Sequence, residues 1–125
     1  MSVKLGTTAQ SEVIVDIDNT AINIGSGSLP VFSTPSLVAL MENAAVKCLN
    51  GFFDESLTTV GIALNIEHLK ASSVGEKIIA KATLVNICNR ELLFDVEAYD
   101  SKGMIGRGSH KRFVINKENF MRKLK

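Results

Sequence analysis

An acid and a histidine stand out in this sequence because each interrupts an otherwise apolar pattern. Glu42 is the only acidic residue between Leu37 and Leu49, and its helical neighbours three and four residues away are all apolar. His68 continues the alternating apolar series 60–66, so it belongs to the apolar face of a strand. A carboxylate on an apolar face needs a donor from elsewhere in the protein, and histidine exchanges protons near pH 7. Together the two residues predict general acid–base chemistry.

The hydroxyl of Thr34 is the third candidate group. Thr34 stands before Pro35 at the start of the same apolar segment. It serves either as a helix N-cap or, with the free N–H groups of the first turn, as a donor to a developing oxyanion. Glu42 and His68 also have structural alternatives, a rim position in water and a core histidine bonded to a carbonyl. Along an ideal helix Thr34 and Glu42 are about 12 Å apart, so a substrate or another chain must bridge them.

One helix and several strands are needed to position these residues. Pro35 at the first helical position and Asn50-Gly51 at the exit predict a helix from its N-cap Thr34 to about Leu49. Apolar alternation predicts five strands, and the tail 116–125 predicts a short docked helix. The strands are expected at 11–18, 60–68, 75–84, 92–98 and 104–115, with turns at 89–90 and 100–103 and a loop of small residues at 23–30. Short links between long strands indicate an antiparallel sheet, so the fold class is α+β.

The second face of the predicted sheet is also partly apolar. One helix covers only one face, so we expect a second subunit on the other, most simply in a twofold dimer. The residues off the core register are Ile79, Val85, Ile87, Leu93, Tyr99, Ile105, Phe113 and Ile115.

Composition limits the remaining possibilities. A chain of 125 residues, 46% apolar and 22% charged, is expected to form a single domain, 1–125. A net charge of +1 and few aromatic residues argue against a nucleic-acid partner. The longest uncharged stretch, 21–41, is broken by two prolines, so no membrane span is expected. Cys48 and Cys88 lie among apolar neighbours and form no metal-ligand pattern with the two distant histidines, which favours a reduced, cytoplasmic chain without a metal.

Several short motifs share one order along the chain. They are Val31-Phe32-Ser33-Thr34-Pro35, Met41-Glu42, Val60-Gly61, His68-Leu69 with Ala71 and Gly75, and Gly106-x-Gly108-x-His110-x-Arg112. In this order, from about Ala9 to Arg122, the sequence resembles the fluoroacetyl-CoA thioesterase-like family of hot-dog fold proteins. The resemblance implies a curved five-stranded antiparallel sheet around one central helix, a homodimer joined through the sheets, and acyl-CoA thioester hydrolysis at the dimer interface. It implies that the catalytic threonine, glutamate and histidine are Thr34, Glu42 and His68.

The substrate is expected to contact Phe32, Gly61, Gly108 and Arg112, with coenzyme A present only as part of the substrate and no other cofactor. Gly108 either admits a pantetheine arm or packs closely, and Arg112 either binds a CoA phosphate or forms a structural ion pair. The loop 25–28 offers no aromatic gate before Phe32, so a short or unidentified acyl group is expected rather than narrow specificity for fluoroacetyl-CoA.

In the expected mechanism His68 is the general acid and base. Glu42 orients His68, activates water or attacks, while Thr34 is the nucleophile or a donor to the thioester oxygen. The alternative is a non-catalytic hot-dog module that binds an acyl thioester or a small apolar ligand without hydrolysing it.

Overall fold

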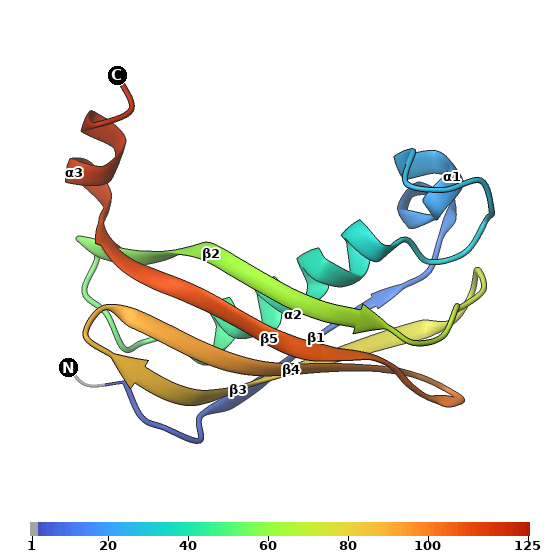
Figure 1. Cartoon of the computed structure of the whole chain (residues 1–125), viewed down its shortest axis with the longest axis horizontal. Coiled ribbons are helices and arrows are strands. Elements are labelled where there is room, and N and C mark those ends of the chain that lie inside the picture. The colour runs from blue at the N-terminus through green and yellow to red at the C-terminus, as the bar shows by residue number, and fades with distance from the viewer. Residues whose placement is uncertain (1–2) are drawn as a thin grey trace.

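The computed structural model describes residues 3–125 as one curved sheet with a long helix in its concave side (Figure 1). All strand pairs are antiparallel, and the order across the sheet is β1-β3-β4-β5-β2. The strands are β1 (Thr8–Ile14), β2 (Leu57–His68), β3 (Lys77–Cys88), β4 (Glu91–Asp100) and β5 (Gly103–Asn116). The helices are η1 (Ile17–Asn19), α1 (Ala21–Ile24), α2 (Thr34–Cys48) and α3 (Lys117–Arg122). The predicted α+β class, the central helix and the five-stranded antiparallel sheet are confirmed.

The central helix α2 begins differently from the prediction. Ser33, not Thr34, is the N-cap, because its Oγ accepts a hydrogen bond from the N–H of Ser36 at 3.1 Å. Thr34 is therefore the first residue inside the helix, and Pro35 follows it in the first turn, where its missing N–H costs nothing. Because the neighbouring serine caps the helix, the hydroxyl of Thr34 is free for another partner.

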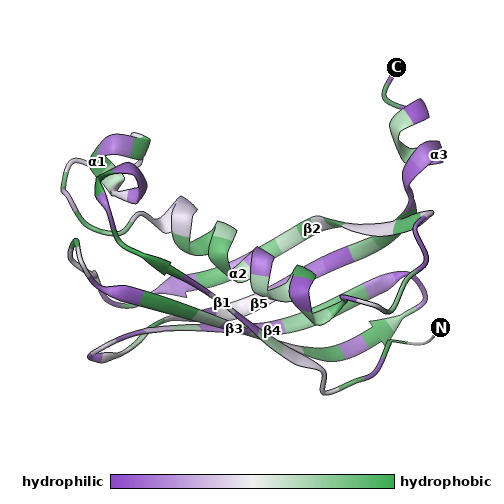
Figure 2. Ribbon diagram, turned by 180° about the vertical axis from the view of Figure 1, so that it is seen from behind, coloured by the Kyte–Doolittle hydropathy of each residue, from purple (hydrophilic) through white to green (hydrophobic). Residues whose placement is uncertain are grey.

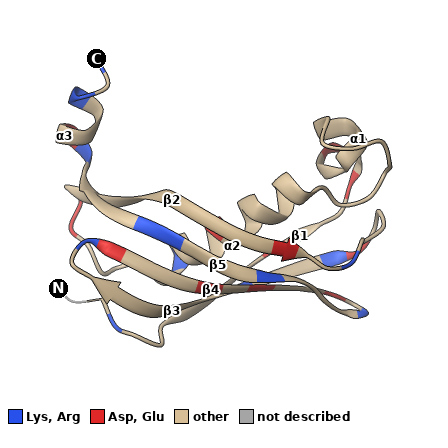
Figure 3. Ribbon diagram, in the orientation of Figure 1, with Lys and Arg blue, Asp and Glu red and all other residues tan. Residues whose placement is uncertain are grey.

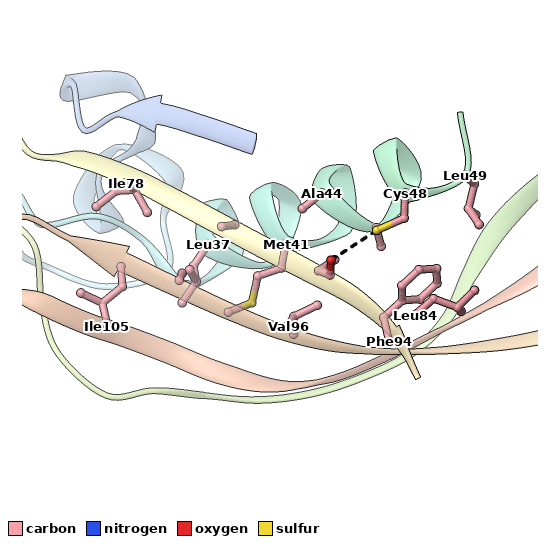
Figure 4. Packing of buried hydrophobic residues seen from close by; sticks show 14 of the residues in the cluster. Leu37, Met41, Ala44, Cys48, Leu49, Ile78, Leu84, Phe94, Val96 and Ile105 are labelled. Carbon is pink, nitrogen blue, oxygen red and sulfur yellow. Dashed lines mark hydrogen bonds between the residues drawn. The ribbon is translucent and has the colours of Figure 1, made fainter. Parts of the chain in front are cut away.

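The core lies between α2 and the inner faces of β3 and β4. Figure 4 shows Leu37, Met41 and Ala44 of α2 directed towards these strands, and the thiol of Cys48 donating to the carbonyl of Ala82 at 3.3 Å. The alternation predicted for the two strands is confirmed, since every residue predicted to face inward is buried. These residues are Ile78, Ala80, Ala82 and Leu84 of β3, and Leu92, Phe94, Val96 and Ala98 of β4. Their burial supplies the main driving force for this fold.

A bulge in β2 changes which of its residues face the helix. Gly61 pairs with Arg112 and Ala63 with Lys111, so Ile62 between them has no partner and is 49% exposed. An extra residue reverses the alternation of side chains. The prediction that 60 and 62 share the face of His68 is therefore wrong, because Gly61 faces inward before the bulge and Leu64, Ile66 and His68 face inward after it.

A second bulge, between β4 and β5, explains another difference. Ala98 pairs with Gly106 and Tyr99 with Met104, which leaves Ile105 without a partner. Ile105 is fully buried, although the regular alternation predicted it on the outer face. On the outer face Val85 and Phe113 are exposed as expected, and the hydropathy of the ribbon alternates along the strands (Figure 2). Ile87 was also predicted on this face, but a further bulge in β3, between Leu84 and Asn86, pairs it with the buried Leu92 and turns it to the inner face.

The two ends of the chain differ from the predictions in detail. The first strand lies earlier, at Thr8–Ile14, and Ile17 is exposed in the short helix η1. The single turn α1 begins before the predicted loop of small residues and ends inside it, at Ile24. The C-terminal helix α3 forms, but it projects from the sheet (Figure 1) and leaves Met121 and Leu124 exposed, so its predicted docking is wrong. Cys88 is also exposed, contrary to the apolar surroundings expected from its neighbours.

Charged residues are spread over the outer surface. Figure 3 shows acidic and basic segments interspersed along β4 and β5. Ion pairs cross between neighbouring strands, for example Lys111 with Glu91 at 3.8 Å and Arg107 with Glu67 at 3.8 Å. Exposed pairs of this kind contribute little to stability. Within residues 3–125, every helix is too short or too polar to cross a bilayer.

Candidate active site

Thr34 and His68 meet where α2 begins and β2 ends. The Oγ1 of Thr34 lies 2.8 Å from the Nδ1 of His68, a hydrogen-bond distance. Two backbone contacts hold the flanking segments together: Val31 forms a β-bridge with Ser73, and the N–H of Phe32 donates to the carbonyl of Ser72 at 2.9 Å. The pair predicted from the sequence is thus brought together by the chain just before α2 and just after β2.

The surroundings of His68 favour the neutral imidazole. Burial lowers the pKa of His68 below its ordinary value, and the nearby backbone of Lys70 opposes this shift only in part. With Nδ1 on Thr34, the other ring nitrogen Nε2 is buried and has no hydrogen-bond partner among the described residues. A neutral histidine of this kind can accept a proton at one nitrogen and exchange one at the other.

A pocket of about 280 Å³ borders this pair. Thr34 and His68 both line it, together with Ala21, Ser26, Val31, Phe32, Leu69, Lys70 and Ala71. Most of these side chains are small or apolar, and Lys70 brings an exposed cation to the rim. The sequence patterns singled out Phe32 but gave no indication of Ala21, Ser26 or Lys70. Ala21 and Ser26 reach the pocket through α1 and the loop after it, and Lys70 follows the end of β2.

Glu42 lies in a second polar centre, two turns along α2. Its Oε2 is 3.7 Å from Nη1 of Arg112, and the two side chains are 39% and 9% exposed. Within residues 3–125 the ion-pair partner of this carboxylate is therefore Arg112, and the expected contact with His68 is not made. The structure unites Thr34 with His68, and separately Glu42 with Arg112.

The guanidinium of Arg112 is held by the inner face of the sheet. Its Nε donates to Oγ1 of Thr59 at 2.9 Å and its Nη2 to the carbonyl of Thr59 at 3.1 Å. Its Nη1 donates to Nε2 of His110 at 3.1 Å, and Nδ1 of His110 donates to the carbonyl of Ala63 at 2.9 Å. The sequence showed His110 and Arg112 on one strand face but could not pair them with Glu42, because that contact depends on the packing of α2 against β5.

Three other residues predicted to contact the substrate are Phe32, Gly108 and Arg112, and each of them packs against or binds other parts of the protein. Phe32 is fully buried beneath the pocket. A Cβ on Gly108 would lie 2.1 Å from the carbonyl oxygen of Asn65, so this glycine allows β5 and β2 to pack closely. Gly106 lies under Leu37 and Met41 of α2. For Arg112 the structure has the ion pair, the second of the two expected alternatives.

Comparison with known proteins identifies the family to which this architecture belongs. A sequence profile of the fluoroacetyl-CoA-specific thioesterase family matches residues 15–118. A fluoroacetyl-CoA thioesterase from Streptantibioticus cattleyicolor is 33% identical over 95 residues, which cover 76% of this chain and 68% of that protein. A solved structure of the fluoroacetyl-CoA thioesterase FlK superimposes with a TM-score of 0.92 at 27% identity, over 99% of this chain and 96% of that one. A thioesterase superfamily member from Thermus thermophilus gives a TM-score of 0.89 at 26% identity, over 98% and 93% of the two chains.

The curled sheet around α2, with a threonine–histidine pair at the helix start, defines a thioesterase of the hot-dog fold. Within that class, the chain belongs to the fluoroacetyl-CoA-specific thioesterase family. The resemblance found in the sequence is thereby confirmed.

Proposed function

We propose that this thioesterase hydrolyses acyl-CoA thioesters with Thr34 and His68 as its reacting pair. The observation that carries the proposal is the 2.8 Å contact between Thr34 Oγ1 and His68 Nδ1 at the edge of a pocket. The buried, unpartnered Nε2 of His68 supports it, because a polar atom in that state is usually reserved for a ligand or water. A relative in this family has been solved with fluoroacetate and CoA, at a TM-score of 0.88 and 27% identity.

Proton transfer through His68 is the centre of the proposed mechanism. Neutral His68 accepts a proton from the attacking oxygen as that oxygen bonds to the thioester carbon, and the carbon–sulfur bond then breaks. The imidazolium returns the proton to the departing CoA thiolate, so the products are the free thiol and an acyl group on oxygen. If Thr34 attacks, a water molecule then releases the carboxylic acid from an acyl-threonine. If water attacks directly, Thr34 donates a hydrogen bond to the thioester oxygen.

The proposed active site is shared between two copies of the chain. Glu42 lies eight residues along α2 from Thr34, about 12 Å at the rise of an α-helix, so one chain alone leaves the carboxylate away from the histidine. A homodimer that joins the open edge of β2 would bring the two polar centres of different copies closer. The apolar residues on the outer face, including Val85 and Phe113, and the exposed Ile62 on the edge strand support such an interface.

The acyl group is proposed to be short or unidentified rather than fluoroacetyl alone. The pocket of about 280 Å³ is bordered by Ser26 and Ala21, and the segment 25–28 carries no aromatic side chain that could close over a small acyl group. The exposed ammonium group of Lys70 at the rim suits the phosphates of CoA. The chemistry uses Thr34, His68, water and the carboxylate of Glu42 from the other copy, and needs no metal.

The test is thiol release from a panel of acyl-CoA esters of increasing chain length, detected optically. Hydrolysis by the native protein and its loss in His68→Ala support the proposal. Thr83→Ala is the matched hydroxyl control, since Thr83 alternates with buried residues of β3 and so faces away from the core. Binding of CoA esters without thiol release, measured by calorimetry, would instead support a non-catalytic binding module.

A further inference from the structure

A second pocket, of about 300 Å³, lies between β1 and α2. Among the described residues, Phe32 alone borders both this pocket and the one beside Thr34 and His68. We propose that Phe32 is the wall at which the acyl pocket ends, and that a shorter side chain there would admit the tail of a longer acyl chain to the second pocket. This inference rests on the proposed function and names the residue that sets the length of the acyl group.

An alkyl chain would find an apolar surface in the second pocket. Val13 of β1 and the helix residues Ala39 and Leu40 supply the apolar part of its lining. No described residue on its wall is charged, so a carboxylate or a phosphate would lose its hydration there without gaining an ionic partner.

The polar side chains on the wall of the second pocket already have partners within the protein. Asn19 is hydrogen-bonded to the backbone at the start of η1. The hydroxyl of Ser33 donates to that of Ser36 at 2.7 Å, and the side chain of Asn43 accepts a hydrogen bond from the hydroxyl of Ser11. What the pocket offers a ligand is therefore mainly its apolar surface, which suits a hydrocarbon tail.

The order of chemical groups along the two pockets matches that of an acyl-CoA ester. The ammonium group of Lys70 is exposed at the rim of the first pocket, and Thr34 and His68 border the same pocket. Phe32 follows, and the apolar second pocket lies beyond it. An acyl-CoA ester presents its phosphates, its thioester and its alkyl chain in the same sequence. With the thioester at Thr34 and His68, the alkyl chain is directed at Phe32.

The backbone of Phe32 is held independently of its ring. Phe32 forms a β-bridge with Thr20, and its N–H donates to the carbonyl of Ser72 at 2.9 Å. The side chain is 1% exposed and belongs to the hydrophobic core. Because these backbone contacts do not depend on the side chain, a shorter residue opens the space between the pockets and leaves Thr34 in place.

The experiment measures kcat/KM for straight-chain CoA esters from acetyl to decanoyl in the native protein, Phe32→Leu and Phe32→Ala, with folding checked by circular dichroism. In the native protein we expect kcat/KM to fall once the chain is long enough to meet the ring. In both variants the optimum should move to longer chains. Each methylene that enters the second pocket should raise kcat/KM about fourfold. Phe32→Leu is the milder change and preserves the test if Phe32→Ala does not fold.

Two further variants separate loss of the wall from a general loss of packing. Phe53→Leu is the matched control, because Phe53 packs against the same core and borders neither pocket. It should lower the stability without changing which ester is preferred. Ala39→Phe fills the second pocket from α2, so in the Phe32→Leu background it should return the preference to short chains.

Three results would overturn the role of Phe32 and leave the thioesterase proposal intact. One is a native kcat/KM that keeps rising through the longest chains, and another is the same preference in the native protein and in folded Phe32→Leu. The third is a shift to long chains that persists when Ala39→Phe is added, because the tail would then lie elsewhere. If the native protein hydrolyses no CoA ester, the proposed function fails and this inference fails with it.

Discussion

Gly61→Ala is the change whose outcome the structure defines most closely. The new methyl group would lie 2.8 Å from Oε2 of Glu42, so the carboxylate must move by about 0.6 Å to restore an ordinary contact. The side chain of Glu42 is partly exposed and can move, whereas His110 and Arg112 are buried and held by hydrogen bonds. The carboxylate of Glu42 is therefore the group that moves. Since a displacement of about 1 Å at a reacting group can cost about a hundredfold in rate, we expect kcat to fall at least about tenfold.

The stability should change much less than the activity. Overpacking costs about 1–3 kcal/mol, and replacing a strand glycine by alanine returns about 0.5–1 kcal/mol of backbone entropy. The net cost is therefore about 0–2.5 kcal/mol, which lowers Tm by at most about 10 °C in a domain of this length. Thiol release and thermal denaturation of the same samples measure both quantities.

A matched variant isolates the cause of the Gly61→Ala effect. In a Glu42→Ala background the carboxylate is gone, so Gly61→Ala should have almost no further effect on Tm or on residual turnover. An unchanged kcat in Gly61→Ala alone would contradict the reasoning, because it would mean that the position of this carboxylate does not matter. A comparable loss in both backgrounds would mean that the methyl group acts through something other than Glu42.

Four further results are expected. His68→Ala should lower kcat for CoA-ester hydrolysis by about 10²–10⁴, and Thr34→Ala combined with it should add little, because the two act as one unit. The plot of kcat/KM against pH should rise through the pKa of His68, below the ordinary histidine value of about 6.5, because the neutral ring is the base; a flat profile from pH 5 to 8 would exclude this assignment. For the same reason, stability measured in urea should be complete above about pH 6.5 and decline as the pH falls through the unfolded-state pKa, because His68 and His110 bind protons more readily when unfolded. Ser33→Ala should cost about 1 kcal/mol of unfolding free energy through the lost cap and also reduce activity by loosening Thr34, whereas a Tm equal to that of the native protein would argue against the capping role.

The oligomeric state is tested separately by sedimentation. At micromolar concentration we expect a dimer or a multiple of it, because apolar residues of the outer face and the edge of β2 are open in one chain. A stable monomer that still hydrolyses CoA esters would remove the shared site from the proposal.

The elements with strong periodicity could be predicted from the sequence, and the departures from periodicity could not. The inward residues of β4, and those of β3 up to Leu84, follow strict alternation and were predicted residue by residue. Ile62, Ile87 and Ile105 were misplaced because a bulge inserts a residue without any local change in composition. Ser33 and Thr34 are both good caps, so the position of the helix start was ambiguous until the hydrogen bond to Ser36 was known.

The candidate site was predictable to a similar degree. Thr34 is predictable because it stands before Pro35 at a helix start, and His68 because it interrupts an alternating apolar strand; the structure joins them. The partner of Glu42 could not be predicted, because Arg112 of β5 comes close to Glu42 only when α2 packs on the sheet. Local patterns identify a residue that needs a partner, but long-range packing decides which partner it has.

The bulge at Ile62 also determines where the chain can change in length. Since Gly61 and Ala63 pair with the adjacent residues Arg112 and Lys111, removing Ile62 would leave a regular ladder with every partner retained. Loss of one residue between Leu64 and His68 has the opposite effect, because it turns one end of β2 to the wrong face. His68 would then leave Thr34, or Gly61 would leave Glu42. Relatives can therefore differ in length at Ile62 and keep the active site. A change in length a few residues further along β2 would disrupt the active site.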